Sequence, residues 1–349
     1  MKKNNYQQLS IFEKDLEILN IQNRRYLGSK QKLLPFIDSV VKSHTENVQI
    51  VADIFGGTGV VGNLFREQGK QIIINDILTS NYVSYLTWFG NEKIDYSKIK
   101  TIIQELNHLK EVSGYVSHHF GNRYFSIENA GKIDAIREKI ESYANLNQRE
   151  RAFLLTSLLY AMDKAANTVG HFDAYRKVMS NTIPLQLRVP INNINQDNQI
   201  FNENANELVK RIYADLIYID TPYNSRGYEN AYHVLENIIE WKKPEVEGIA
   251  KKAVNRSAKT SDYTKSKAPQ AFDSLIKEVN AKYILVSYNN MENKGNARSN
   301  AKISKDEIIS ILEKRGSVQI FETDFNAFTT GKSSIANHKE CLYLCTIIK

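Results

Sequence analysis

Residues 49–76 read QIVADIFGGTGVVGNLFREQGKQIIIND, and this order of residues predicts strand, turn, helix and strand. The apolar runs 49–53 and 71–76 each end at an acidic residue, and each has the length of a buried strand. The glycine-rich turn between them leads into a helix that is expected to bury Val60, Val61, Leu64 and Phe65. A βαβ unit of about 30 residues predicts an α/β fold built on a parallel sheet.

The rest of the chain is expected to extend this sheet beyond a long helical segment. Apolar residues at helical spacing, among them Ile133, Ile136 and Ile140, predict helices from about residue 80 to residue 169. This segment is too long for one crossover connection, so it predicts a helical insertion. Further strands are expected at 184–190, 215–220, 283–287, 318–321 and 342–348.

Charge and composition narrow the class of partner. The chain has 349 residues, and its 46 lysines and arginines exceed its 39 acidic residues, for a formal net charge of +7. This excess favours a polyanionic partner, and nucleic acid is the first candidate, although many soluble proteins are mildly basic. The polar N-terminus lacks the apolar core of a secretory signal, and no run reaches the roughly 18 apolar residues of a membrane span.

The two cysteines, Cys341 and Cys345, lie four residues apart in an apolar run. A strand would hold them about 13 Å apart, which is too far for a disulfide. We therefore expect buried thiols of a cytoplasmic protein, and no metal site, because a zinc site normally needs four ligands.

The glycine-rich turn is the first candidate site. A turn that carries Gly56, Gly57 and Gly59 lets a ligand lie against bare backbone near the positive end of the following helix. Asp76, at the end of the next strand, is placed to accept hydrogen bonds from ribose hydroxyls. The pattern therefore indicates a cofactor that contains adenosine. It fits an NAD enzyme and a methyltransferase equally well.

The second candidate site is the run Asp220, Thr221, Pro222 and Tyr223, which follows an apolar strand. An open parallel sheet places its ligands at the carboxyl ends of its strands. Tyr223 offers an aromatic face for stacking, and Asp220 and the carbonyl of Thr221 offer acceptors for an exocyclic amine. The alternative is a strand that enters a proline-containing turn with a buried tyrosine.

Taken together, these motifs resemble those of a known family. Asp220-Thr-Pro-Tyr223 is similar to the D-P-P-Y motif of N6-adenine methyltransferases, and the run Asp53-Ile-Phe55-Gly56-Gly57-Thr-Gly59 resembles their S-adenosylmethionine loop. The upstream run Arg25-Tyr-Leu-Gly-Ser-Lys30 resembles the N-terminal motif of the D12-class, Dam-like adenine methylases, and the motif order is that of their alpha group. Similarity continues through 220–226, 232–236 and 283–289, so the resemblance covers most of the chain from Arg24 onward.

The resemblance implies a fold and a cofactor site. The fold is a Rossmann-like methyltransferase sheet, mostly parallel with one antiparallel strand near the C-terminus. We expect a polar arm at 1–22, a catalytic domain at 23–92 and 181–349, and a helical insertion at 93–180 for target recognition. The implied cofactor is S-adenosylmethionine, held by Tyr26, Lys30, Asp53, Phe55, Gly56, Gly57, Gly59, Asp76 and Asp220, with Lys30 suited to its carboxylate.

Two departures from the family pattern stand out. Thr221 replaces the first proline of D-P-P-Y, which keeps the backbone carbonyl but loosens the turn. The acid expected to contact the adenine amine of the cofactor falls in the run Asn202-Glu-Asn-Ala-Asn206, where Glu203 or an asparagine oxygen must serve. We leave that contact unassigned.

The implied activity is site-specific methylation of adenine N6 in double-stranded DNA, within a restriction–modification system. A separate restriction endonuclease is a further possible partner, no membrane is involved, and the location is the prokaryotic cytoplasm, on DNA. The target base must leave the helix to be reached. Candidate DNA contacts are Tyr175, Arg176, Lys177, Arg226, Lys251, Lys252, Arg256 and Lys259; the basic segment 251–267 has a solvated loop as its alternative.

Four alternatives to this activity remain. An RNA adenine methylase could use the same clamp, and an N4-cytosine methylase uses similar geometry but commonly has serine at the Asp220 position. A catalytically weak cofactor-binding DNA module is suggested by Thr221 alone. An NAD dehydrogenase explains the glycine turn but neither of the other motifs.

Overall fold

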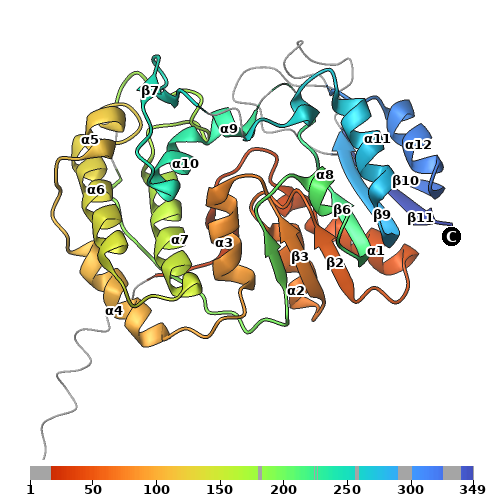
Figure 1. Ribbon diagram of the computed structural model, residues 1–349, viewed down its shortest axis with the longest axis horizontal. Helices are drawn as coiled ribbons and strands as arrows, with labels where there is room; N and C mark the ends of the chain where they lie inside the picture. Colours follow the sequence, from red (N-terminus) through yellow and green to blue (C-terminus); the bar gives the residue numbers. More distant parts are fainter. Residues whose placement is uncertain are drawn as a thin grey trace, which may run out of the picture.

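The computed structural model describes residues 17–179, 183–223, 225, 227–255, 259–289, 301–324 and 339–348. Within these ranges a seven-stranded sheet has the order β10-β11-β9-β6-β2-β3-β5 (Figure 1). Only β11 runs antiparallel to the other strands of this sheet, as predicted. The strands are β2 Ile50–Asp53, β3 Gln71–Asn75, β5 Gln199–Phe201, β6 Ala214–Ile219, β9 Ala281–Asn289, β10 Gly316–Asp324 and β11 Lys339–Ile347.

The sheet buries both of its faces because successive apolar side chains point to opposite faces. In β6, Leu216 and Tyr218 join one buried cluster, whereas Ile217 and Ile219 join the other. This is the period of two that a strand imposes on its side chains. The first cluster includes α1 Leu34–His44, α2 Val60–Glu67, α3 Thr79–Phe89 and α10 His233–Glu240; the second includes α8 Ala205–Leu208, α11 Ala268–Glu278 and α12 Lys305–Glu313.

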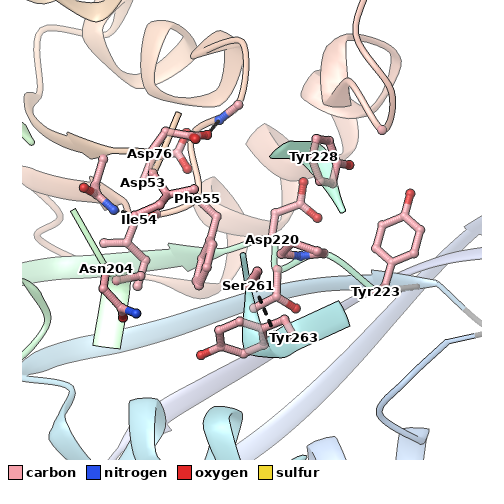
Figure 2. Close-up of a pocket in the computed structure, with 18 of the residues that line it drawn as sticks. Asp53, Ile54, Phe55, Asp76, Asn204, Asp220, Tyr223, Tyr228, Ser261 and Tyr263 are labelled. Atoms are coloured by element: carbon pink, nitrogen blue, oxygen red, sulfur yellow. Dashed lines mark hydrogen bonds between the residues drawn. The ribbon is translucent and has the colours of Figure 1, made fainter. Parts of the chain in front are cut away.

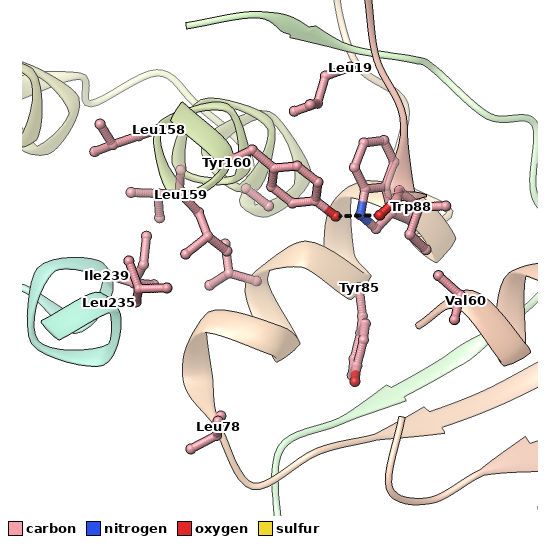
Figure 3. Close-up of a cluster of buried hydrophobic side chains, with 14 of the residues drawn as sticks. Leu19, Val60, Leu78, Tyr85, Trp88, Leu158, Leu159, Tyr160, Leu235 and Ile239 are labelled. Atoms are coloured by element: carbon pink, nitrogen blue, oxygen red, sulfur yellow. Dashed lines mark hydrogen bonds between the residues drawn. The ribbon is translucent and has the colours of Figure 1, made fainter. Parts of the chain in front are cut away.

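The segment predicted as an insertion contains α4 Tyr96–Asn107, α5 Tyr115–Phe120, α6 Ile127–Ser142 and α7 Gln148–Ala165. Its helix α7 packs on α3, and the hydroxyls of Thr87 and Thr156 lie 2.8 Å apart between them. Figure 3 shows the shared core, with Trp88 of α3 beside Tyr160 of α7. This helical half is therefore continuous with the core beside the sheet, and its separation as a recognition domain stays a prediction.

The strand predicted at 184–190 is wrong for most of its length. Leu185, Leu187 and Val189 are buried in alternation, which explains the prediction. However, the backbone N–H groups of Leu185 and Leu187 donate to the side chains of Asn129 and Asn107, not to a strand. Asparagine side chains of α6 and α4 thus take the place of a neighbouring strand. Only β4 Val189–Pro190 is paired, outside the main sheet, with β1 Ile18–Leu19.

Part of the predicted N-terminal arm is also folded. Leu19 and Ile21 are buried in the main core, and the 3₁₀ helix η1 Ile21–Asn23 follows β1. Residues 1–16 lie outside the described residues. The described part of the predicted polar arm is therefore folded, because its few apolar side chains pack into the main core.

The smaller expectations have mixed outcomes. Strand β5 was not predicted, whereas Val60, Val61 and Phe65 are buried as expected and Leu64 is only partly buried. The segment 251–267 is not a plain loop, because it contains β8 Lys252–Ala253, paired with β7 Val246–Glu247, and the 3₁₀ helix η4 Asp262–Thr264. Cys341 and Cys345 are free and buried. No described helix has the length and apolar character needed to cross a bilayer.

Candidate active site

Three aspartates meet where neighbouring parallel strands end. Asp53 ends β2, Asp76 follows β3 and Asp220 follows β6. Strand order reverses at β2, since β3 lies on one side of it and β6 on the other, and such a switch point opens a crevice for ligands. A cavity of about 430 Å³ lies there, lined by all three aspartates. Figure 2 shows Asp220 between Asp53 and Asp76 on one side and Tyr223 on the other.

The glycine turn forms one wall of this cavity. A Cβ at Gly57, whose φ is +53°, would lie 3.2 Å from the ring of Tyr26, so a side chain there would crowd the wall. The carbonyl of Gly57 accepts a 2.8 Å hydrogen bond from the hydroxyl of Tyr85. Gly56 and Phe55 also line the cavity. Gly59 does not; it begins α2 with φ +83°, packed against Tyr85, Phe89 and Ile21.

Asp76 is held in place by the backbone around it. Its carboxylate accepts hydrogen bonds from the N–H groups of Gly57 at 3.0 Å and Leu78 at 2.8 Å. Burial raises the pKa of Asp76 to about 6, although these bonds and one from Asn81 oppose the rise. Asn81 is fixed in turn, because its side-chain oxygen accepts from buried Arg24 at 2.6 Å.

Asp53 is the most deeply buried of the three carboxylates. Its Oδ2 accepts from the N–H of Gly62 at 3.3 Å, and its Oδ1 has no hydrogen-bond partner among the described residues. Burial, together with the nearby charge of Asp220, raises the pKa of Asp53 to about 8. Such a group is largely protonated at neutral pH, which fits a wall position beside other acids.

Lys30 brings the N-terminal motif to the catalytic motif. It begins the 3₁₀ helix η2 Lys30–Leu33, and its buried ammonium lies 2.8 Å from Oδ2 of Asp220. Burial alone would lower the pKa of Lys30, but the carboxylates of Asp220 and Glu340 outweigh it and raise the pKa. Burial raises the pKa of Asp220, and Lys30 opposes this rise. The other oxygen of Asp220, Oδ1, has no partner in the described part of the chain.

The turn after Asp220 is fixed from behind. The carbonyl of Tyr223 accepts a 2.8 Å hydrogen bond from the N–H of Lys302, and the Tyr223 and Tyr288 rings meet edge to face at 5.8 Å. Thr221 and Pro222 line the cavity. Gly28 passes so close that a Cβ there would lie 3.0 Å from the Tyr228 hydroxyl and 3.5 Å from that of Tyr223.

The run 202–206 borders the Asp76 side of the cavity. Glu203, Asn204 and Asn206 line it, and Glu203 forms an ion pair with Arg211. The side-chain oxygen of Asn204 caps α8, and that of Asn206 accepts a 2.8 Å bond from the hydroxyl of Tyr263. Asn202 instead donates to the carbonyl of Asp76 at 2.7 Å.

Several residues of the cavity belong to no motif that the sequence shows. Tyr263 meets Phe55 edge to face at 5.2 Å, and Tyr228 stacks on Tyr26 at 5.5 Å. Neither tyrosine lies in an apolar run or in a glycine-rich turn. The nearest signal in the sequence is the family similarity of residues 232–236, a segment that ends at Glu236. The carboxylate of Glu236 accepts hydrogen bonds from the N–H groups of Thr79 and Ser80 and so caps α3.

The predicted DNA contacts have different outcomes. The DNA contact of Lys259 stays a prediction; its ammonium pairs with Glu236 and, at 2.7 Å, with Glu240, and Lys259 itself lines the cavity. Arg226 and Arg256 lie outside the described residues. Arg176 and Lys177 are exposed, and Tyr175 is half-buried against Tyr124. Lys251 and Lys252 are half-buried on the β7–β8 hairpin, where Lys252 lies 3.3 Å from Asp173.

The fold and cavity are those of a Rossmann-like methyltransferase: a switch-point crevice joins a glycine turn to an Asp-x-Pro-Tyr turn. Residues 26–326 match the family of D12 class N6 adenine-specific DNA methyltransferases, and the chain belongs to this family. It is 39% identical to the modification methylase StsI of Streptococcus sanguinis over 76% of this chain and 44% of that protein. It is 31% identical to the type II methyltransferase M.NlaIII of Neisseria lactamica, over 90% of this chain and 95% of that protein. A third relative, M.CviAII of Paramecium bursaria Chlorella virus 1, is 30% identical over 90% of this chain and 95% of its own length.

Proposed function

We propose that this protein is a site-specific DNA methyltransferase that transfers the methyl group of S-adenosylmethionine to N6 of adenine in duplex DNA. One observation carries the proposal: a single cavity contains both the glycine turn with Asp76 and the turn from Asp220 to Tyr223. One part suits an adenosine-containing cofactor, and the other suits the amine and ring of a base. Family membership and relatives named as modification methylases support the same reaction.

The residues present fit S-adenosylmethionine. A carboxylate has about four lone-pair positions, so Asp76, with three donors already in place, can accept one more from a ribose hydroxyl. An ammonium has about three donors. Lys30 directs two of them at Asp220 and the carbonyl of Gly28, at 2.8 and 3.3 Å, which leaves one for a carboxylate. The bare backbone of Gly56 and Gly57 completes the cradle.

The chemistry begins from an unreactive amine. The lone pair of adenine N6 is delocalised into the ring, so the amine must be polarised before it reacts. Oδ1 of Asp220, which has no partner among the described residues, and the carbonyl of Thr221 would accept its two N–H groups. S-adenosylmethionine supplies a methyl group on a positively charged sulfur. As the nitrogen gains the methyl group it gives up a proton, which Asp220 is placed to accept because burial raises its pKa.

The base must reach this cavity from outside the helix. A base stacked in duplex DNA hides its amine, so the target adenine is turned out of the helix. Tyr223 offers a ring for it to stack on; Tyr288 packs on that ring, and the N–H of Lys302 donates to the carbonyl of Tyr223. Transfer then depends on positioning and electrostatics, without a covalent intermediate.

We place the protein in a prokaryotic restriction–modification system, in the cytoplasm on DNA, with a restriction endonuclease that acts separately. The support is that M.NlaIII, which this chain matches over 95% of that protein's length, is named a type II methyltransferase. DNA sequenced from an expressing host should carry modified adenines at one recurring sequence. Modification without a recurring sequence would contradict site specificity.

The direct test uses the purified chain, labelled S-adenosylmethionine and two polymers of the same sequence, one duplex DNA and one RNA. We expect label in the DNA, and mass spectrometry of its digest should show N6-methyladenine in large excess over N4-methylcytosine. Label in the RNA alone would make the protein an RNA methylase. A product dominated by methylcytosine would overturn the choice of base.

A further inference from the structure

Two surface segments beside the active site carry features that the reaction does not explain. One is the β7–β8 hairpin, where the N–H of Lys251 donates to the carbonyl of Gly248 at 3.2 Å and closes a turn. The turn presents Ile249 at its corner, 84% exposed. The other is the segment 166–179, which follows α7 and exposes 71% of Val178. An exposed apolar side chain on a segment beside a cavity is a candidate contact for a partner.

Both segments are fastened to the same point of the fold. The carbonyl of Ala250, at the hairpin tip, lies 2.6 Å from Nε2 of His233 and 3.0 Å from the hydroxyl of Tyr124. The N–H of Phe172, in the other segment, donates to the carbonyl of Ala231 at 2.6 Å. Residues 231–233 join α9 Tyr228–Ala231 to α10, and α9 begins at a tyrosine of the catalytic cavity. The two segments therefore sit beside the cavity on fixed supports.

Tyr124 also connects the two segments. Its hydroxyl lies 3.0 Å from the carbonyls of both Ala250 and Phe172, and its ring packs edge to face on Tyr175 at 5.1 Å. Figure 1 shows β7 at the top of the view, beside the helical half and on the same side of the molecule as α9. Segments about 75 residues apart in sequence thus form one surface, which we call the composite surface.

Both segments of the composite surface carry basic side chains. Arg176 and Lys177 are exposed on one segment, and Lys251 and Lys252 lie on the other. Burial, followed by the charges of His118, Lys251 and Arg123, lowers the pKa of His119 in α5. The acids are Asp173, beside Lys252, and Glu245 and Glu247, which lie just before β7 and in it. The basic side chains lie in the turn at Lys251, in β8 and on the segment 166–179.

We propose that the composite surface grips the DNA duplex that flanks the target adenine, with Ile249 against base pairs and the lysines and arginines against phosphates. An apolar side chain gains nothing from a phosphate but can pack on a base edge such as a thymine methyl. Phosphate contacts position the duplex without reading its sequence. Positive charge beside the cavity favours DNA over a protein partner as the occupant. This inference rests on the proposed function.

The consequence is that sequence recognition is divided between two parts of the chain. The insertion contributes Arg176 and Lys177, whereas the hairpin lies after the catalytic turn in the sequence. Ile249 would therefore help to select the target site, and Lys251 would strengthen binding to every site. Because Ile249 and Lys251 lie two positions apart, replacing each in turn compares sequence selection with general DNA affinity at one place on the surface.

The test compares Ile249→Ser and Lys251→Ala with matched controls in the full-length protein. Ile194→Ser replaces an isoleucine that is 97% exposed in the loop before β5, at the opposite ends of the strands from the cavity. Lys277→Ala replaces an exposed lysine near the end of α11, next to the start of β9. Once sequencing has defined the site, methylation rates are measured on the cognate duplex and on duplexes with single altered flanking pairs. Duplex affinity is measured over a range of salt.

Ile249→Ser should reduce the preference for the cognate duplex about tenfold at one or more flanking pairs, with the salt dependence unchanged. Lys251→Ala should weaken binding to the cognate and altered duplexes equally. The slope of log affinity against log salt concentration should fall by about 0.9. Both controls should behave as wild type. If Ile249→Ser keeps the wild-type preference, or changes the oligomeric state instead, the inference is overturned. If the wild type methylates no DNA at all, it is the proposed function that fails.

Discussion

The two ends of strand β6 carry one aspartate each, and their surroundings are opposite. Asp215, near the start, accepts hydrogen bonds from the N–H groups of Gln49 and Ile50 at 2.8 and 2.9 Å, and from Lys282 at 2.8 Å. Asp220, just past the end, has Lys30 alone at 2.8 Å and an Oδ1 without a partner among the described residues.

The pKa values of these two groups follow from this difference. Burial alone would raise the pKa of Asp215, but Lys282 and the two backbone donors outweigh it and hold it at about 2. Burial raises the pKa of Asp220, because one cation only partly opposes it. A carboxylate with all of its partners stabilises the fold, whereas one that lacks partners is ready for a substrate.

The largest expected effect separates these two roles. Asp220→Ala removes the acceptor for the amine, so methyl transfer should fall by about 100-fold to 1000-fold or more. Asp215→Ala is the matched control on the same strand and should lower the midpoint of thermal unfolding while it keeps most of the activity per folded molecule. Methyl transfer is followed with labelled cofactor, and folding by circular dichroism.

Asp220→Ala also leaves Lys30 buried without its partner, which by itself lowers stability. The double variant Asp220→Ala/Lys30→Met removes both charges and restores folding if the single variant loses it. Activity above a few per cent of wild type in either folded variant would contradict the role of Asp220.

Asp76 lies between these extremes, and its replacement should act on binding. Asp76→Ala removes an acceptor for the ribose, so cofactor affinity should weaken by about 1.5–3 kcal/mol. The turnover rate at saturating cofactor should change much less. Isothermal titration calorimetry measures the affinity, and an unchanged value would exclude Asp76 from the cofactor site.

The next prediction concerns stacking of the target base on Tyr223. Tyr223→Ala should cost about 1–3 kcal/mol in the rate on an intact duplex, because the extruded base loses its aromatic support. A mismatch or abasic site opposite the target lowers the cost of extrusion and should restore part of that rate. Absence of this rescue would mean that Tyr223 orients the amine instead.

The smallest effect is the pH dependence of stability that comes from Asp215. Its pKa is about 2 in the folded protein against its ordinary value of 3.8, so its contribution to stability is present above pH 4 and is lost as pH falls toward 2. We expect the free energy of unfolding to fall by about 1–2 kcal/mol over this range, after allowance for solvent screening at the half-exposed Lys282. Urea unfolding of wild type and Asp215→Asn at several pH values measures this loss, and parallel curves would contradict it.

Sequence patterns predicted the sheet well where strands are long and apolar. The runs before Asp53, Asp76 and Asp220 all became parallel strands of one sheet. The run 184–190 has the same alternation, yet Asn107 and Asn129 supply its backbone partners from helices. Alternation reports which side chains are buried and does not report what the backbone pairs with.

The candidate site was predictable where a short motif supplies its own geometry. The glycine turn and the turn from Asp220 to Tyr223 need only their neighbours in sequence and the end of a strand. Lys259, whose phosphate contact stays a prediction, shows the limit of reasoning from a short segment. The fold brings it to Glu236 and Glu240, which are not visible as partners in the linear sequence.

The sequence by itself determined the long apolar strands, the glycine turn, the turn from Asp220 to Tyr223 and the family resemblance, because each depends on residues that lie close together in the chain. Tertiary structure alone decided which of those residues meet. It paired Lys30 with Asp220 across 190 positions and left Oδ1 of Asp220 without a partner among the described residues. It also joined the hairpin tip to the segment after α7 through Tyr124. The physical reason is that burial and charge pairing depend on distance in space, which the spacing of residues along a chain does not set.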